Sequence, residues 1–257
     1  MINVEISICI GLFVLGTILG SFYNVVGYRL PKEESIVTPP SHCPNCNHRL
    51  EPWELIPIVS FLLQGGKCRS CKQKISWFYP VFEAFCGLLF VLSYISFGFN
   101  LELIIVLTFI SMLIIIMVSD YNYMIIPDEV LIFFGVAILI EKIFIEGIKS
   151  IPYALLSALV AFVVMFLLKK MGDLIFKQES MGGGDIKLLA IFGLMLGIPN
   201  ALISIVAGAF IGLPISLIAV NLKKTHIVPF GPFLALGAIV VLLTHFDLST
   251  LISVLTW

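Results

Sequence analysis

The sequence predicts an all-α, polytopic membrane protein with about eight transmembrane helices and one small cytosolic loop domain that binds zinc. Hydrophobic residues make up 60% of the 257 residues and charged residues only 12%, whereas an ordinary soluble domain is roughly 45–50% apolar. The mean hydropathy is +1.10. Apolar stretches long enough to cross a hydrocarbon core of about 30 Å recur along the chain, and helices satisfy the backbone there.

The expected elements follow from these apolar stretches in chain order. We predict membrane spans at residues 4–26, 79–97, 101–118, 129–146, 151–168, 187–198, 200–221 and 233–252. The first stretch has neither a basic segment before it nor a small-residue cleavage site after it, so we expect a retained helix rather than a secretory signal. The sixth stretch is about 12 residues, or about 18 Å of helix, which is short for a crossing.

The basic residues predict the orientation of the spans. With the N-terminus outside, all Lys and Arg residues except Lys142 and Lys149 fall on the inner side, in agreement with the positive-inside rule. If the sixth span were re-entrant, Lys223 and Lys224 would move to the outer side. We therefore expect this short span to cross, with local thinning of the bilayer.

The first inner loop, residues 27–78, carries two C-x-x-C motifs. Their cysteines are Cys43, Cys46, Cys68 and Cys71. Two such motifs supply the ligand set of a tetrahedral four-cysteine zinc site, although their separation is just beyond the usual range. A loop of roughly 50 residues has too little apolar material for a core of its own, and a metal ion would supply the missing stability. A pair of disulfides is the alternative, which a reducing cytosol disfavours.

A polar stretch between two apolar runs places three glycines directly before an acid. These residues are Gly182, Gly183, Gly184 and Asp185. Glycines let a bound peptide approach the backbone closely, and an acid at a helix start is placed for chemistry. Counting spans brings Asp120, at the end of the third span, to the same inner face as Asp185. Two neighbouring carboxylates share a proton, as in aspartic proteases; the alternative is that each is an interfacial helix-end acid.

Three further charged residues are candidates for supporting this pair. Asp128 opens the fourth span after Pro127, where the helix dipole favours an acid, so capping is favoured over catalysis. Glu83 lies near the start of the second span and either occupies the first turns of that helix or lines a pocket. Lys187 either tunes Asp185 or contacts lipid phosphate and solvent.

The motifs together resemble those of the bacterial type IV prepilin peptidases, membrane aspartyl proteases of the GxGD class that serve pili, type II secretion and competence. The matching segments are 20–26, 28–31, 40–46, 66–71, 75–76, 120 with 126–128, 182–188 and 229–233. The resemblance runs nearly end to end, and the order of the motifs is specific. One departure is Phe78, which stands where members of the family often carry Arg.

The resemblance implies that Asp120 and Asp185 cleave a basic leader from prepilin or pseudopilin substrates, after a Gly, at the cytoplasmic face of the bacterial inner membrane. It also implies methylation of the new N-terminal amine with S-adenosylmethionine, for which the sequence has no recognisable donor motif. We divide the chain into a first transmembrane helix (1–26), a cytosolic tetracysteine zinc loop domain (27–78) and a seven-helix protease core (79–257).

Two other functions remain as alternatives. A proton-coupled transporter of small molecules or ions could use the same acid pair beside a glycine-broken helix, but it would need acids near mid-membrane. An assembly or receptor protein could use the cysteine loop to bind a partner, but the acid pair would then have no role. Membrane lipid is an expected contact in every case, and no nucleic-acid-binding motif is present.

Overall fold

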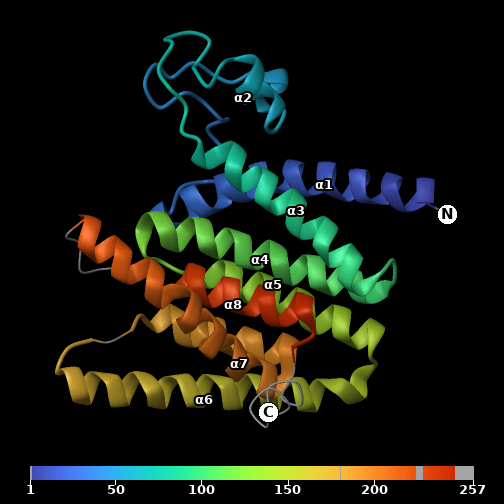
Figure 1. The fold of residues 1–257 in the computed structure, drawn as a ribbon, viewed down its shortest axis with the longest axis vertical. Coiled ribbons are helices and arrows are strands. Elements are labelled where there is room, and N and C mark those ends of the chain that lie inside the picture. The colour runs from blue at the N-terminus through green and yellow to red at the C-terminus, as the bar shows by residue number, and fades with distance from the viewer. Residues whose placement is uncertain (1, 180, 224–227, 247–257) are drawn as a thin grey trace. The chain divides into compact units, whose positions relative to one another are not determined.

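The computed structural model describes residues 2–179, 181–223 and 228–246 (Figure 1). The helices are α1 Ile2–Arg29, α2 Val59–Leu63, α3 Phe78–Phe97, α4 Leu101–Tyr123, α5 Asp128–Ile145, α6 Ile151–Phe176, α7 Gly183–Lys223 and α8 Gly231–Thr244, with 3-10 turns η1 Leu30–Lys32, η2 Pro52–Leu55 and η3 Ile148–Ser150. Within the described residues the only β pairing is two isolated bridges in the cysteine loop. The predicted all-α class is confirmed.

Helix lengths and composition agree with a membrane protein. Among the described residues, the helices long and apolar enough to cross a membrane are Val4–Lys32, Phe78–Phe97, Leu101–Tyr123, Ile148–Ile175 and Gly183–Ile218, and α8 is a shorter apolar helix. The predicted spans correspond to α1, α3, α4, α5, α6, the two parts of α7, and α8. The predicted span 233–252 extends past residue 246, and its end lies outside the described residues.

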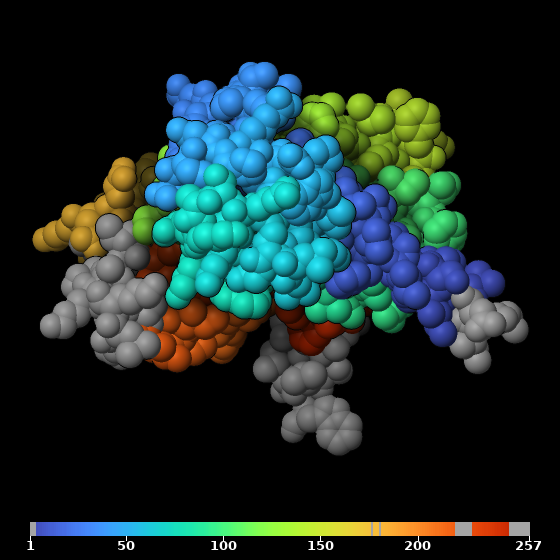
Figure 2. All heavy atoms as spheres, turned by 90° about the horizontal axis from the view of Figure 1, so that it is seen from above, coloured from blue at the N-terminus to red at the C-terminus, as the bar shows by residue number. Residues whose placement is uncertain are grey.

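The chain divides into two compact units, Met1–Gly98 and Phe99–Trp257. In the first unit α1 packs along α3. The two backbones touch at glycines, because a Cβ on Gly16 would lie 2.7 Å from the Cα of Gly87. Such close approach is typical of membrane helices. The loop between α1 and α3 forms one contiguous lobe of atoms, coloured blue to cyan in Figure 2.

Among the membrane-length helices described in the second unit, α4 is the most deeply buried: 72% of the residues in its apolar 18-residue stretch lie inside the molecule. Asn100 caps its start by accepting the Leu103 N–H at 3.1 Å. α5 and α8 pack against α4, α7 packs against both of them, and α6 lies beyond α7 (Figure 1). The rings of Phe109 on α4 and Phe192 on α7 meet edge to face at 5.7 Å. This packing brings the end of α4 near the starts of α7 and α8.

α7 is two helical segments joined at a bend. Gly197 has φ 78° and ψ 172°, a conformation outside the helical region, and Pro199 follows it. Only glycine adopts this backbone readily, and proline begins a helical segment without needing its missing N–H. The bend therefore separates the predicted sixth and seventh spans where the sequence places their boundary.

Candidate active site and cysteine cluster

Asp120 lies in the last turn of α4 and is only 6% exposed. The helix ends three residues later, at Tyr123, where Met124 adopts a left-handed conformation and its N–H returns to the Asp120 carbonyl at 2.9 Å. The Asp120 carboxylate accepts a hydrogen bond from the backbone N–H of Gly231, with 2.9 Å between N and Oδ2. Gly231 is the first residue of α8. A helix start carries partial positive charge, so this contact stabilises a carboxylate.

Gly231 is a residue of the candidate site that the sequence analysis does not single out. A Cβ built on it would lie 2.8 Å from Asp120 Oδ2 and 3.0 Å from Cγ, so any side chain would displace the acid. The available signal was the run Pro229-Phe230-Gly231-Pro232 ahead of the last apolar stretch, which the family resemblance included without assigning it a role.

Asp185 lies in the first turn of α7 and is 7% exposed. Its carboxylate lies beside the backbone of Gly182, where an added Cβ would be 3.4 Å from Asp185 Oδ2. The two acids that the sequence predicts as a pair are separated by 64 residues in the chain, and they lie on segments, the end of α4 and the start of α7, that pack closely where Gly184 meets Ile126. Both acids are buried, and the start of a helix lies at each of them, α8 at Asp120 and α7 at Asp185.

The three glycines before Asp185 differ in their surroundings. A Cβ on Gly184 would lie 2.8 Å from the Cβ of Ile126, in the segment that follows α4. Gly184 therefore lets the two acid-bearing segments pack closely. A Cβ on Gly182 would lie 3.4 Å from Asp185 Oδ2, whereas one on Gly183 would meet nothing within 4 Å.

Lys187 and Asp128 form an ion pair beside the two acids. The Lys187 Nζ lies 2.8 and 2.7 Å from the two carboxylate oxygens of Asp128. Asp128 is the first residue of α5, and the N-cap position before it is Pro127, so Asp128 is not the N-cap residue. Its carboxylate instead pairs with Lys187, which lies in the first turns of α7. Both side chains are about half exposed, and such a pair contributes about 0–1 kcal/mol.

Glu83 belongs to the first unit and anchors the cysteine loop to α3. It is buried and accepts the backbone N–H of Ile58 at 2.8 Å. Ile58 has φ 61°, a conformation that is rare and strained for a β-branched residue. The hydrogen bond to Glu83 helps to hold that strained turn.

The four predicted cysteines form one cluster in this loop. Their sulfur atoms all lie within 4.8 Å of one another, with 3.8 Å between Cys43 and Cys71 and 3.9 Å between Cys46 and Cys68. Four thiolates at about 2.3 Å from one zinc ion would be about 3.8 Å apart, whereas a disulfide is about 2.05 Å long. The cluster can therefore hold a metal ion, and its geometry disfavours the disulfide alternative.

The two C-x-x-C turns have the same backbone design. In the first, the Asn47 N–H donates to the Cys43 carbonyl, and in the second the Lys72 N–H donates to the Cys68 carbonyl. Asn47 and Lys72 both have positive φ, 57° and 61°. The side-chain amide of Asn45 contacts the Cys71 sulfur at 3.6 Å, and this bond is the main reason that the pKa of Cys71 falls to about 6. A thiolate is the metal-binding form of cysteine.

A buried acid that the sequence did not single out supports the first turn. Glu54 Oε2 accepts the Glu51 N–H at 3.0 Å and lies 3.1 Å from His48 Nε2. Burial acts to raise the pKa of Glu54, but the Glu51 N–H and His48 together bring it below its ordinary value. Glu54 thus ties the turn η2 to the strand-like segment after Cys46.

Comparison with known families agrees with this arrangement. The model described as the bacterial peptidase A24 N-terminal domain matches residues 14–97, and that of the type IV leader peptidase family matches residues 107–217. These matches fall within the two structural units. No solved structure matches the chain.

Curated relatives cover nearly the whole chain. A protein named prepilin leader peptidase/N-methyltransferase from Bacillus subtilis (strain 168) is 40% identical over 232 residues, which are 89% of this chain and 91% of that protein. Proteins of the same name are 32% identical over 251 residues in Neisseria gonorrhoeae, covering 87% and 86%, and 31% identical over 258 residues in Pseudomonas aeruginosa, covering 89% and 88%.

Proposed function

Because the chain belongs to the type IV leader peptidase family, we propose that Asp120 and Asp185 are its catalytic pair. The enzyme is a membrane endopeptidase that removes the leader from prepilin-like proteins. The observation that carries the assignment is the pair itself: two buried carboxylates, one in the last turn of α4 and one in the first turn of α7, on segments that pack closely where Gly184 meets Ile126. Two neighbouring buried carboxylates can share one proton, and aspartic proteolysis needs such a shared proton.

The chemistry follows from that shared proton. One carboxylate takes a proton from a water molecule as its oxygen attacks the scissile carbonyl, and the other donates its proton to the carbonyl oxygen. The resulting tetrahedral intermediate collapses when the C–N bond breaks and the leaving amine takes up the proton that the first carboxylate gained. Gly231 N–H steadies Asp120 throughout, because a backbone donor needs no side-chain rearrangement.

The position of the pair suits the substrate. Asp120 lies three residues from the end of the 23-residue α4, and Asp185 lies in the first turn of α7. Both acids therefore lie at one end of the bundle rather than at mid-membrane, which disfavours the transporter alternative. The protein is a multi-pass inner-membrane protein, and the excess of Lys and Arg on the same side supports a cytosolic active site. A prepilin would present an apolar helix in the bilayer and a basic leader beside the acids.

We further propose that zinc is the ion that the cysteine cluster holds. Two pairs of sulfurs at 3.8 and 3.9 Å fit the edge of a tetrahedral zinc–thiolate site. Four cysteine ligands leave no open position, so the ion would stabilise the loop domain and take no part in hydrolysis.

The relatives' names also include N-methyltransferase, and we propose that this enzyme methylates the amine that cleavage exposes. S-adenosylmethionine supplies an electrophilic methyl group to such an amine. Mass spectrometry of the mature substrate N-terminus tests this activity separately: a processed substrate without the mass of one methyl group would mean a peptidase alone.

The catalytic assignment is tested by co-expressing the enzyme with a prepilin substrate. Asp120→Asn and Asp185→Asn should each abolish processing while accumulating in the membrane at the wild-type level. Glu102→Gln is the matched control, because this acid is exposed at the opposite end of α4. Near wild-type processing by either Asn variant would contradict the assignment.

A further inference from the structure

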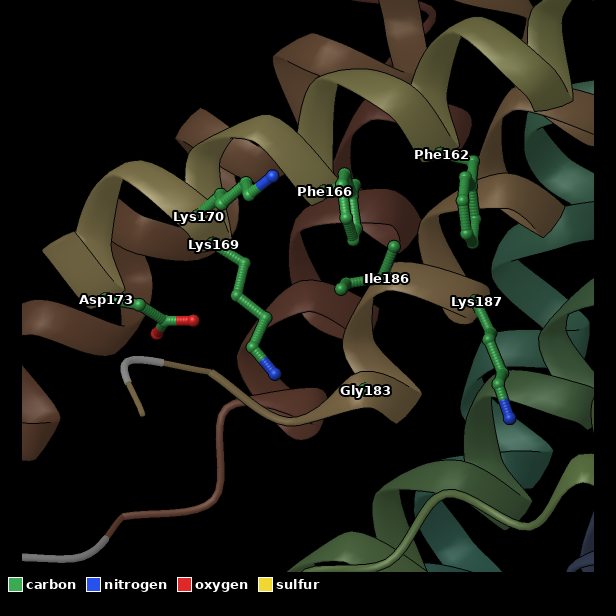
Figure 3. A pocket seen from close by; sticks show the side chains of 8 residues that line it. All are labelled: Phe162, Phe166, Lys169, Lys170, Asp173, Gly183, Ile186 and Lys187. Atoms are coloured by element: carbon green, nitrogen blue, oxygen red, sulfur yellow. The ribbon is translucent and has the colours of Figure 1, made fainter. Parts of the chain in front are cut away.

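A pocket of about 460 Å³ lies between the last turns of α6 and the first turn of α7 (Figure 3). It is lined by Phe162, Phe166, Lys169, Lys170, Asp173, Gly183, Ile186 and Lys187. Its size falls in the range of small-ligand sites. Neither Asp120 nor Asp185 lines it, so the pocket is separate from the acid pair while sharing the start of α7 with it.

The pocket has one apolar part and one cationic part. The rings of Phe162 and Phe166 are parallel, with an interplanar angle of 5° and centroids 6.4 Å apart, and Ile186 faces them (Figure 3). Three lysines are among the other lining residues, and of these Lys187 is directed away toward Asp128. Lys170 lies with its Nζ 5.8 Å from the centre of the Phe166 ring, and the Lys169 side chain extends toward the segment at Gly183 (Figure 3). The lining therefore matches an amphipathic ligand with an anionic end.

The depth of these residues in the bilayer separates the two parts. α6 begins at Ile151, and the helix from there to Lys169 rises about 27 Å, close to the thickness of the hydrocarbon core. Lys169 and Lys170 therefore lie at the level of the lipid headgroups. Phe166 and Phe162 lie about one and two turns deeper, at the level of the acyl chains.

The charged side chains that line the pocket have a net positive charge. Asp173 is the one acid among the lining residues, against three lysines. Asp128 pairs with Lys187 from the neighbouring helix α5. A second cavity of about 530 Å³ shares Phe162 and Lys187 with the first, and its other lining residues on α5 and α7 are almost all apolar. The headgroup-level pocket thus adjoins a path for a hydrocarbon chain.

We propose that this pocket binds an anionic phospholipid. Its phosphate lies at Lys169 and Lys170, and one acyl chain crosses the rings of Phe166 and Phe162. Gly183, Ile186 and Lys187 flank Asp185 in the same helical turn, so a bound lipid packs against the segment that carries this acid. The inference goes beyond the proposed function, and lipid binding is measured without reference to peptidase activity.

The test compares lipid binding to the purified full-length protein by native mass spectrometry, with phosphatidylglycerol and phosphatidylcholine as the probes. Lys169→Gln with Lys170→Gln should weaken phosphatidylglycerol binding about 25-fold, because each juxtamembrane lysine contributes about 5-fold to binding of an anionic lipid. Replacing both by Arg should restore binding. The matched control, Lys74→Gln with Lys149→Gln, removes the same charge from exposed positions elsewhere and should bind as wild type.

Other outcomes would overturn the proposal. Equal binding of phosphatidylcholine, or an equal loss in the control variant, would mean non-specific attraction of lipid to the protein's net charge. Displacement of phosphatidylglycerol by millimolar inorganic phosphate would mean a free-phosphate site. If the double Gln variant does not fold, as judged by circular dichroism, the exposed single change Lys170→Gln is measured instead, and binding within 2-fold of wild type would count against the site.

Discussion

The sharpest prediction concerns Gly231, where one methyl group should disable the candidate active site. In Gly231→Ala the new Cβ would lie 2.8 Å from Asp120 Oδ2, 3.0 Å from Cγ and 3.2 Å from Cβ. Carbon and oxygen atoms that are not bonded prefer separations of about 3.5 Å or more. The acid must therefore move by several tenths of an ångström, and its hydrogen bond to the Gly231 N–H, now 2.9 Å, must lengthen or break.

The magnitude follows from what that bond contributes. A hydrogen bond to a charged group is worth about 1.5–3 kcal/mol, which is a factor of about 10 to 150 in rate. A displaced catalytic group costs a further loss of up to about 100-fold. We expect kcat for leader cleavage to fall by about 100-fold with KM nearly unchanged, because Gly231 contacts the acid and not the distant parts of the substrate.

The assay is leader cleavage by purified enzyme in detergent or nanodiscs, with a thermal melt to confirm folding. Gly11→Ala is the control, because a Cβ there meets nothing within 4 Å. Gly231 does not have a positive φ, so alanine is not excluded by its backbone conformation. Processing by Gly231→Ala within about 3-fold of wild type would refute the reasoning, since a contact of 2.8 Å cannot be kept without moving Asp120.

Three further predictions follow from other contacts. Gly184→Ala should destabilise the protein by about 1–3 kcal/mol and slow cleavage, because its Cβ would lie 2.8 Å from that of Ile126; thermal melts and cleavage rates test it. Elemental analysis should find about one zinc ion per wild-type chain and none in Cys43→Ser, and the loop between α1 and α3 should become sensitive to protease in this variant. Glu54 has a lowered pKa, so it stabilises this loop above its unfolded pKa, and that contribution is lost as the pH falls through the folded pKa.

Each of these has its own control. Gly183→Ala, with open space around its Cβ, should melt as wild type, and an equal loss in both variants would point to helix propensity instead of packing. Wild-type zinc content in Cys43→Ser would remove this cysteine from the ligand set. For the acid, Glu54→Gln should flatten the pH dependence of protease resistance below pH 4.5, the ordinary value from which the pKa of this carboxyl is lowered, and an unchanged profile would mean that other groups control it.

The sequence by itself determined the class of protein and predicted its candidate site residues. The patterns used were all local: recurring apolar stretches, the positions of Lys and Arg, two C-x-x-C motifs, and an acid after three glycines. Each can be recognised without knowing how the helices pack. They predicted the helices, the cysteine cluster and the pair Asp120 and Asp185, because hydrophobicity and ligand type are properties of single residues and their near neighbours.

The tertiary structure alone decided how those residues are held. The partner of Asp120 is a backbone N–H 111 residues away, and no side chain marks it. Gly184 contacts Ile126, and Glu83 anchors Ile58, in each case across segments that only folding brings together. The lysine-lined pocket likewise forms between α6 and α7. Such contacts depend on how helices pack against one another, and hydrophobic patterning specifies which face of a helix is buried but not which atoms it meets.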